Sequence, residues 1–269
     1  MGIFKRVASG LIGFPIVVLL MLFGNQIIID VVFAIVGLIC VHEFYSAFKE
    51  KEIHPIKWIG YISVMLIAFM HIIPQEHYLL CIRVAIPITV ALSFIQVIIT
   101  KMKYNVMDVA VTALGVVYIV YFIAFIPMIR NMENGHILIW YPIFSAWGTD
   151  TFAYFAGITM GKHKFSTISP KKSIEGCIGG ILGSTLMVFV YTYLMNRFYE
   201  FNMNYLYIII MAIIMSVISQ FGDLIASSIK RHVDIKDFGN LIPGHGGLLD
   251  RFDSMIFVAP FVYLFFCLV

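Results

Sequence analysis

The sequence predicts an all-α protein that crosses a membrane several times. Of its 269 residues, 61% are hydrophobic and 12% are charged, and the mean hydropathy is +0.95. Soluble domains carry only about 45–50% apolar residues, so a water-soluble protein of this length is excluded. Apolar runs of about 17–25 residues, the length of a membrane-spanning helix, recur along the chain. No polar stretch is long enough for a separate soluble domain, and we therefore expect one polytopic domain, residues 1–269.

About nine helices are expected to span the membrane. The first two are joined only by Gly24 and Asn25, which leaves room for nothing longer than a tight hairpin. The N-terminal segment has the basic start of a signal peptide but no small-residue cleavage site before the next apolar run, so we expect it to be retained as the first span. The expected spans are residues 8–23, 26–47, 58–73, 78–100, 107–129, 137–161, 177–196, 203–226 and 254–269.

The placement of the basic residues predicts the orientation. If the N-terminus lies inside, every Lys and Arg except Arg83, Arg130 and Arg197 falls in a segment on the inner side. Because inner loops are the ones that collect Lys and Arg, the N-terminus is expected in the cytoplasm and the C-terminus outside. The two longest loops, 162–176 and 227–253, are then both cytoplasmic and basic. They are expected to bind something anionic at the inner surface of the cell membrane.

Two aspartates fall inside predicted helices, where a charge costs about 2.5–3.5 kcal/mol on insertion scales. They are Asp150 in WGTDTFAY and Asp223 in SQFGDLIASS. For either one, a hydrogen bond to a neighbouring helix is the structural alternative to a functional role. Asp223 is not alone, because Ser227 and Lys230 follow at i+4 and i+7 and so share its helix face. This polar stripe predicts a functional site at the cytoplasmic end of the helix.

The stretch PGHGGLLDRFD, Pro243–Asp253, concentrates polar chemistry in an otherwise apolar chain. If the last helix opens here, Asp250 and Asp253 lie one turn apart and face roughly the same way. Carboxylates bind Mg²⁺ through oxygen, whereas Lys and Arg bind phosphate oxygens directly. Glycines let backbone N–H groups approach a phosphate closely. A basic loop that merely attaches to anionic lipid is the simpler alternative, but it explains neither Asp223 nor the paired glycines.

The other long loop, GKHKFSTISPKKSIEG, has a similar composition. Ser173 is placed to cap a helix that starts near Ile174, beside Lys171 and Lys172, which favours a site for nucleotide phosphates. The GxxxxGK[ST] pattern of a P-loop is absent. The glycines that follow have GxxxG spacing, which indicates close helix packing rather than chemistry. His42-Glu43, near the end of the second span, is interpreted as structural and is expected at the level of the lipid headgroups.

Several segments together resemble the signature of the phosphatidate cytidylyltransferases, also called CDP-diacylglycerol synthases. They are SSIKR from Ser227, Lys236-Asp237, PGHGG from Pro243, and DRFD from Asp250, with WGTDTFAYFAG and GKHK…SPKKSIEG upstream. The similarity covers residues 145–254, the expected catalytic region, whereas residues 1–140 are expected to form lipid-facing scaffold helices. The resemblance implies transfer of CMP from CTP to phosphatidic acid with Mg²⁺ as the cofactor. Two divalent ions are expected, and Mn²⁺ is a possible replacement for Mg²⁺.

The resemblance also implies roles for individual residues. Carboxylates would bind the metal, basic residues would hold phosphates of the lipid or pyrophosphate, and His245 would either donate to a phosphate or shape the glycine turn. The expected partners are CTP, phosphatidic acid and membrane lipids. Nucleic acid is not expected to bind, and the chain is compatible with a homodimer. The expected catalytic residues are Asp223, Lys230, Arg231, Lys236, His245 and Asp250. The expected metal ligands are first Asp223 and Asp250, with Asp253 as a further candidate. The nucleotide and phosphate contacts are Asp150, Lys171, Lys172, Ser173, Ser227, Gly246 and Gly247.

The alternatives are a lipid kinase and a membrane transporter. A CTP-dependent kinase of a polyprenol or another lipid alcohol would share the nucleotide site but would release CDP. A transporter would carry polar residues along a path through the bilayer and often has inverted repeats. No such repeat is found, and the polar residues crowd at one predicted face. The sequence therefore favours the cytidylyltransferase.

Overall fold

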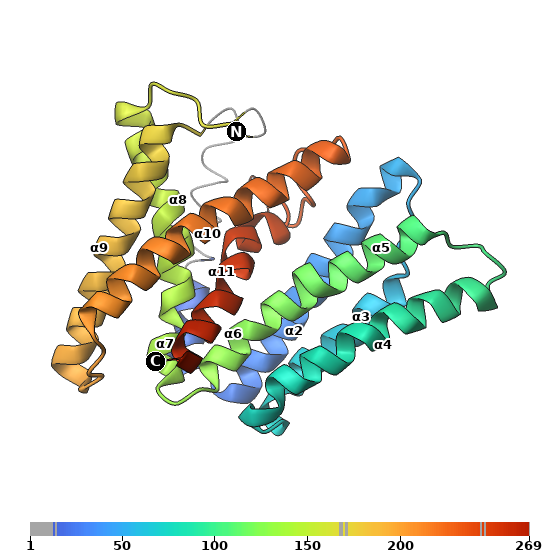
Figure 1. The fold of residues 1–269 in the computed structure, drawn as a ribbon, viewed down its shortest axis with the longest axis horizontal. Coiled ribbons are helices and arrows are strands. Elements are labelled where there is room, and N and C mark those ends of the chain that lie inside the picture. The colour runs from blue at the N-terminus through green and yellow to red at the C-terminus, as the bar shows by residue number, and fades with distance from the viewer. Residues whose placement is uncertain are drawn as a thin grey trace. The chain divides into compact units, whose positions relative to one another are not determined.

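The computed structural model describes residue 13 and residues 15–166, 169, 172–242, 244 and 246–268. Throughout this part of the chain the regular elements are helices, joined by turns and two isolated β-bridges. The chain divides into two compact units. The first contains Met1–His136 and His232–Phe252, and the second contains Ile137–Arg231 and Asp253–Val269. Figure 1 shows the course of the helices.

The first unit holds the N-terminal helices and the loop that follows α10. Val106–Arg130 is one continuous apolar stretch in which a π-helical segment separates two α-helices. The elements are α2 (Gln26–Ala47), η1 (Phe48–Lys51), α3 (Lys57–Ala68), η2 (Met70–Ile72), η3 (Gln75–His77), α4 (Tyr78–Ile99), α5 (Val106–Gly115), η4 (Val116–Tyr121) and α6 (Phe122–Arg130).

The second unit holds most of the C-terminal half. The short α7 (Gly135–Leu138) lies at its boundary, and the last helix, α11, starts in the first unit and continues into the second. The remaining helices are α8 (Trp140–Met160), α9 (Ile174–Tyr199), α10 (Tyr205–His232) and α11 (Leu249–Leu268).

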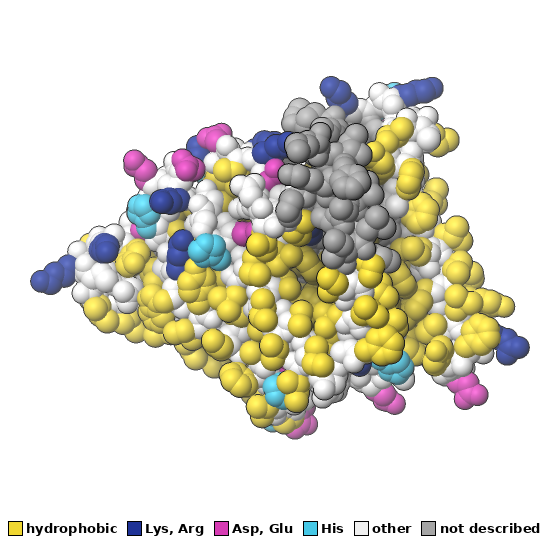
Figure 2. Space-filling model, turned by 180° about the vertical axis from the view of Figure 1, so that it is seen from behind, with side chains coloured by type: hydrophobic (Ala, Val, Ile, Leu, Met, Phe, Trp, Pro, Cys, Tyr) yellow, Lys and Arg dark blue, Asp and Glu magenta, His cyan; other side chains and the backbone are white. Residues whose placement is uncertain are grey.

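The predicted fold class is confirmed. Among the described residues, six helical stretches are long and apolar enough to cross a membrane: Gln26–Lys51, Gln75–Ile99, Val106–Arg130, Ile174–Tyr199, Tyr205–His232 and Leu249–Leu268. The surface agrees with a lipid environment, because apolar side chains cover most of the face in Figure 2.

Three of the nine expected spans are not among these six. The span expected at 58–73 is shorter, because α3 ends at Ala68 and short 3₁₀ turns follow. The span expected at 137–161 forms α8, whose middle carries several polar residues, among them Thr149 and Asp150. The span expected at 8–23 lies largely outside the described residues, although residues 15–23 are helical.

A buried tyrosine organises the core of the first unit. Tyr45 of α2 is 1% exposed and its hydroxyl donates to the carbonyl of Thr112 at 2.8 Å. Its ring fills the space left by two glycines, since a Cβ atom would lie 2.5 Å from the ring at Gly60 and 2.3 Å from it at Gly115. The missing side chains thus let α3 and α5 approach α2 closely.

Glycines also set the packing of the second unit, where α8 and α9 run side by side (Figure 1). A Cβ atom at Gly179 would lie 2.3 Å from the Cβ of Ala156, and one at Gly183 would lie 2.1 Å from the ring of Phe152. The interpretation of the GxxxG spacing as close helix packing is therefore confirmed. Such close approach lets helices gain dispersion contacts where lipid provides no hydrophobic driving force.

We expect Gly179→Leu to lower the thermal unfolding midpoint by several degrees. The added side chain meets Ala156 on a rigid helix, and overpacking of this kind costs about 1–3 kcal/mol. Gly13→Leu is the matched control, because a Cβ atom there meets no atom of the described residues within 4 Å. The midpoints are measured on purified protein in detergent, and equal midpoints for the two variants would contradict the packing described.

Candidate active site

Three aspartates from three helices of the second unit influence one another. They are Asp150 of α8, Asp223 of α10 and Asp253 of α11, and the charges of the first two act on the Asp253 carboxylate. Asp253 is only 6% exposed. The hydroxyl of Ser254 lies 3.5 Å from a carboxylate oxygen of both Asp150 and Asp253, and the Ser254 N–H donates to Asp253 Oδ1 at 2.8 Å. The site thus brings together a buried carboxylate of Asp253, a partly buried one of Asp223 and an exposed one of Asp150.

Two lysines offset part of this charge. Lys172 Nζ lies 2.5 Å from Asp223 Oδ2, and both side chains are about three-quarters buried. The Lys172 nitrogen is itself buried and has no hydrogen bond of good geometry among the described residues, so the contact is one of charge. Lys230, two turns after Asp223 on α10, acts on Asp253. The cluster therefore contains two lysines and three aspartates.

The loop before α9 is folded so that Lys172 reaches Asp223. Lys164 and Ser173 form an isolated antiparallel bridge, and the Phe165 N–H donates to the Lys172 carbonyl at 2.9 Å. Glu175 secures the start of the loop by accepting from the N–H groups of residues 162 and 163 and lying 2.6 Å from His163 Nδ1. The backbone of Lys172 is therefore held by pairing within the loop.

Ser173 caps α9 as the sequence predicts. The Gly176 N–H donates to Ser173 Oγ at 3.1 Å, and the helix begins at Ile174. The cap satisfies one of the backbone N–H groups that a helix start leaves without a partner. It also fixes Ser173 next to Lys172, at the wall of a pocket.

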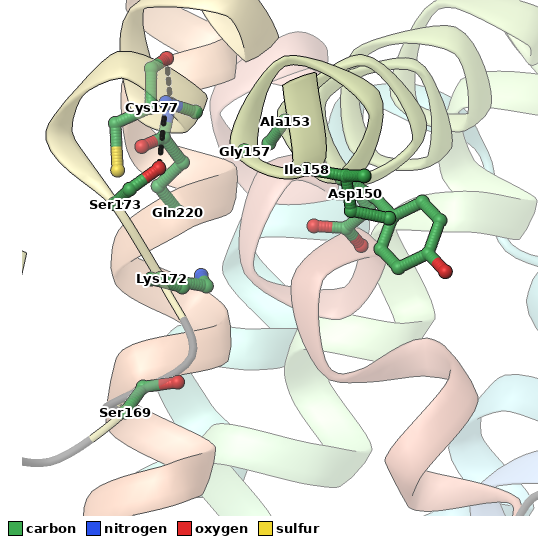
Figure 3. Close-up of a pocket in the computed structure, with 11 residues that line it drawn as sticks. Asp150, Ala153, Gly157, Ile158, Ser169, Lys172, Ser173, Cys177 and Gln220 are labelled. Atoms are coloured by element: carbon green, nitrogen blue, oxygen red, sulfur yellow. Dashed lines mark hydrogen bonds between the residues drawn. The ribbon is translucent and has the colours of Figure 1, made fainter. Parts of the chain in front are cut away.

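This pocket measures about 450 Å³ and lies entirely within the second unit. Figure 3 shows Asp150 on one wall and Lys172 on another, with Gln220 of α10 donating to the Cys177 carbonyl at 3.1 Å. Polar groups are thus present beside apolar ones in the same cavity. The lining residues are Asp150, Ala153, Tyr154, Gly157, Ile158, Ser169, Lys172, Ser173, Gly176, Cys177 and Gln220.

In the first unit, Asp250 organises the glycine-rich loop. Its Oδ2 accepts from the Phe238 N–H at 2.8 Å and from the Gly247 N–H at 3.0 Å. Gly246 has a φ of +87°, which favours glycine, and a Cβ atom there would lie 3.0 Å from Asp250 Oδ2. The N–H of Gly247, predicted to face a phosphate, is therefore directed at a carboxylate in this structure.

The other predicted residues occupy varied positions. Ser227 and Lys230 are half-buried on α10, whereas Arg231, on the same helix, and Lys236, on the loop after it, are exposed. Lys171 and His245 lie outside the described residues. The structure brings together Asp150, Asp223, Asp253, Lys172 and Lys230 in the second unit, and Asp250, Gly246 and Gly247 in the first.

Comparison with known proteins then decides the family. A sequence model of the cytidylyltransferase family matches residues 4–269. The chain belongs to this family. Phosphatidate cytidylyltransferases from Staphylococcus haemolyticus and Staphylococcus epidermidis are each 41% identical over 175 residues, covering 64% of this chain and 65% of the relative. The chain thus spans just under two thirds of these relatives. A phosphatidate cytidylyltransferase from Bacillus subtilis is 30% identical over 271 residues, covering 98% of this chain and 97% of the relative.

The carboxylate groups in the site of this cytidylyltransferase-family member are suitable ligands for a divalent cation. Among the described residues, no three His, Cys, Asp or Glu side chains are already arranged as a metal site. The carboxylates of Asp223 and Asp253 nevertheless interact, and carboxylate oxygen is the ligand that Mg²⁺ prefers. Lys172 Nζ, at 2.5 Å from Asp223, occupies a position where a positive charge is stabilised. The donor set therefore fits a hard cation.

Two residues of the site region were not assigned to it from the sequence. Ser254 joins Asp150 and Asp253, but a lone serine after an aspartate carries no recognisable signal. Glu43 was interpreted as structural, and it is indeed buried and accepts from the backbone at the start of α11, a partner that the sequence did not indicate. The signal that could have found it is a carboxylate at the end of an apolar span, a position where an unpartnered charge is costly.

Proposed function

We propose that this chain transfers CMP from CTP to phosphatidic acid, giving CDP-diacylglycerol and pyrophosphate. The family match and the names of the relatives support this proposal. The observation on which it most depends is the group of Asp150, Asp223 and Asp253 with Lys172, beside a polar pocket in a chain of this family. A site for two strongly negative substrates requires cations, and this group can hold them.

In the proposed reaction, a phosphate oxygen of phosphatidic acid attacks the α-phosphorus of CTP. The bond from that phosphorus to the bridging oxygen breaks, and pyrophosphate leaves with the electron pair. A phosphate monoester has a second pKa of about 6, so the nucleophile is largely dianionic at neutral pH. No strong general base is needed. Orientation and charge neutralisation then provide most of the catalysis.

The aspartates are proposed to bind Mg²⁺, with Asp223 and Asp253 as ligands and Asp250 as a further candidate. A divalent ion held there supplies charge neutralisation to the reacting phosphates. Asp150 borders the pocket and is proposed to orient the nucleotide or the adjoining loop. Arg231 and Lys236, both exposed, are proposed to attract the anionic headgroup to the membrane surface.

Lys172 is proposed to exchange partners during the cycle. Its ammonium group is close to Asp223 but lacks a directed hydrogen bond, so a phosphate oxygen can compete for it. When a triphosphate takes Lys172, the Asp223 oxygen that Lys172 neutralised becomes available to a cation. Binding of nucleotide and binding of metal are thereby coupled at one residue pair.

The protein is proposed to lie in the inner membrane with its site facing the cytoplasm and its N-terminus inside. The distribution of Lys and Arg supports this orientation, since nearly all fall on one predicted side. The apolar helices support an integral membrane location.

The function is tested with membranes that contain this chain, Mg²⁺, phosphatidic acid and CTP labelled on its α-phosphate. We expect label in the organic phase, together with release of unlabelled pyrophosphate. A parallel reaction uses CTP labelled on its γ-phosphate, from which no label should enter lipid. Lipid that acquires only the γ-label would contradict the proposal and indicate a CTP-dependent kinase.

A further inference from the structure

Glu43, in the N-terminal scaffold, contacts the start of α11 far along the chain. It lies near the end of α2 and is only 7% exposed. Its Oε1 accepts from the Leu248 N–H at 3.0 Å, and its Oε2 accepts from the Leu249 N–H at 2.8 Å. Both carboxylate oxygens therefore bind backbone groups of one helix start, and all of these residues belong to the first unit.

The contact supplies something that the local sequence lacks. The first N–H groups of a helix have no partner within the helix and are normally satisfied by a side chain just before it. α11 begins at Leu249, and Gly247 and Leu248 have no side-chain oxygen to offer. Glu43 takes that place from a different helix, and its negative charge suits the positive end of the helix dipole.

Two glycines leave room for the carboxylate. A Cβ atom at Gly239 would lie 2.5 Å from Glu43 Oε1, and one at Gly247 would lie 2.6 Å from Oε2. Neither glycine needs a positive φ, since Gly244 and Gly246 are the described glycines that have one. Their absent side chains are instead explained by the closeness of Glu43. The loop is thus folded around this carboxylate on two sides.

We infer that Glu43 is a positioning residue for the proposed reaction. It fixes residues 238–252, the segment in which Asp250 accepts from Phe238 and Gly247, and with it the first turn of the helix that carries Asp253. Among the described residues, Glu43 donates to none and accepts from two backbone N–H groups, so its effect is exerted through the helix it caps. This inference rests on the proposed function. The inference also gives α2, which lies outside the expected catalytic region 145–254, a role in positioning the site.

Glu43→Gln tests the inference. Glutamine has one acceptor oxygen, and its NH₂ group faces the second backbone N–H, so one hydrogen bond is replaced by a repulsion between donors. We expect kcat to fall by roughly a hundredfold, the cost typical of a displacement of about 1 Å at a reacting centre. The KM for CTP should change less than about twofold, because the nucleotide pocket lies in the other unit. Glu50→Gln, the same change at an exposed position, is the matched control and should retain wild-type kcat.

A second variant keeps the charge and displaces it. Gly239→Ala places a methyl group against Glu43 Oε1 and should lower kcat in the same way. The double variant Glu43→Gln/Gly239→Ala should be little worse than either single variant, since both remove one contact. Wild-type kcat in Gly239→Ala, or full additivity in the double variant, would overturn the inference.

Hydrogen exchange separates this inference from the proposed function. Exchange of the backbone over residues 238–252 should be faster in Glu43→Gln than in wild type or Glu50→Gln, while exchange over α9 stays unchanged. Faster exchange would show that Glu43 holds this segment in place, whether or not the wild-type protein transfers a cytidylyl group. A wild-type protein without transfer activity would contradict the proposed function but not the anchoring role. Unchanged exchange in folded Glu43→Gln would overturn the positioning role.

Discussion

Asp223→Asn is expected to reduce cytidylyl transfer by roughly a thousandfold or more, because it removes a proposed metal ligand and the charge that balances Lys172. Asparagine has the same size but cannot balance Lys172, which lies 2.5 Å from the native carboxylate. The folded structure should persist, since Asp223 is a quarter exposed and the substitution is isosteric. The measurement is label transfer per amount of monodisperse protein in detergent.

Asp234→Asn is the matched control for this prediction. Asp234 follows α10 directly and pairs with Lys51 at 2.6 Å, but the pair is exposed. Exposed ion pairs contribute little, about 0–1 kcal/mol, so activity should stay near that of wild type. Near-normal Mg²⁺-dependent transfer by Asp223→Asn would instead show that the carboxylate has no role in binding metal.

Lys172→Ala is expected to lower kcat/KM for CTP by roughly a hundredfold, the scale of a lost charge-assisted contact to phosphate. The KM for CTP should rise more than the KM for phosphatidic acid, because Lys172 borders the pocket next to the Ser173 cap. Lys164→Ala, an exposed lysine on the same loop, is the control and should behave as wild type. Equal increases in both KM values would argue against a nucleotide contact.

The same variant distinguishes partner exchange from simple phosphate binding. In wild type, Lys172 competes with a cation for Asp223. Its removal should therefore lower the Mg²⁺ concentration that half-saturates the protein in the absence of CTP, where Lys172 still lies against Asp223. A higher Mg²⁺ requirement would contradict the proposed exchange.

Much of this site was predictable from local pattern. The helix around Asp223 follows from its apolar neighbours, and Ser227 and Lys230 share its face in α10 as the spacing predicts. The Ser173 cap and the glycine packing of α9 were also predicted correctly, because each depends on residues a few positions apart. Local spacing is a reliable guide where the contact itself is local.

Other features depend on contacts that no local pattern contains. α10 continues to His232, beyond the expected end at 226. α11 starts at Leu249 rather than at the expected 254, and the cap that allows this start comes from Glu43 of α2. The ion pair between Lys172 and Asp223 joins segments 51 positions apart in the numbering. Such partners are chosen by the tertiary fold, so a single sequence could suggest the residues but not the pairs.

Direct binding of Mn²⁺, a spectroscopic substitute for Mg²⁺, tests the central claim that these aspartates hold a divalent cation. Free Mn²⁺ is measured by electron paramagnetic resonance while it is titrated into purified protein in detergent. Wild type should bind Mn²⁺ saturably, Asp223→Asn and Asp253→Asn should lose that binding, and Lys172→Ala should bind more tightly. Equal Mn²⁺ binding by wild type and both aspartate variants would contradict the account.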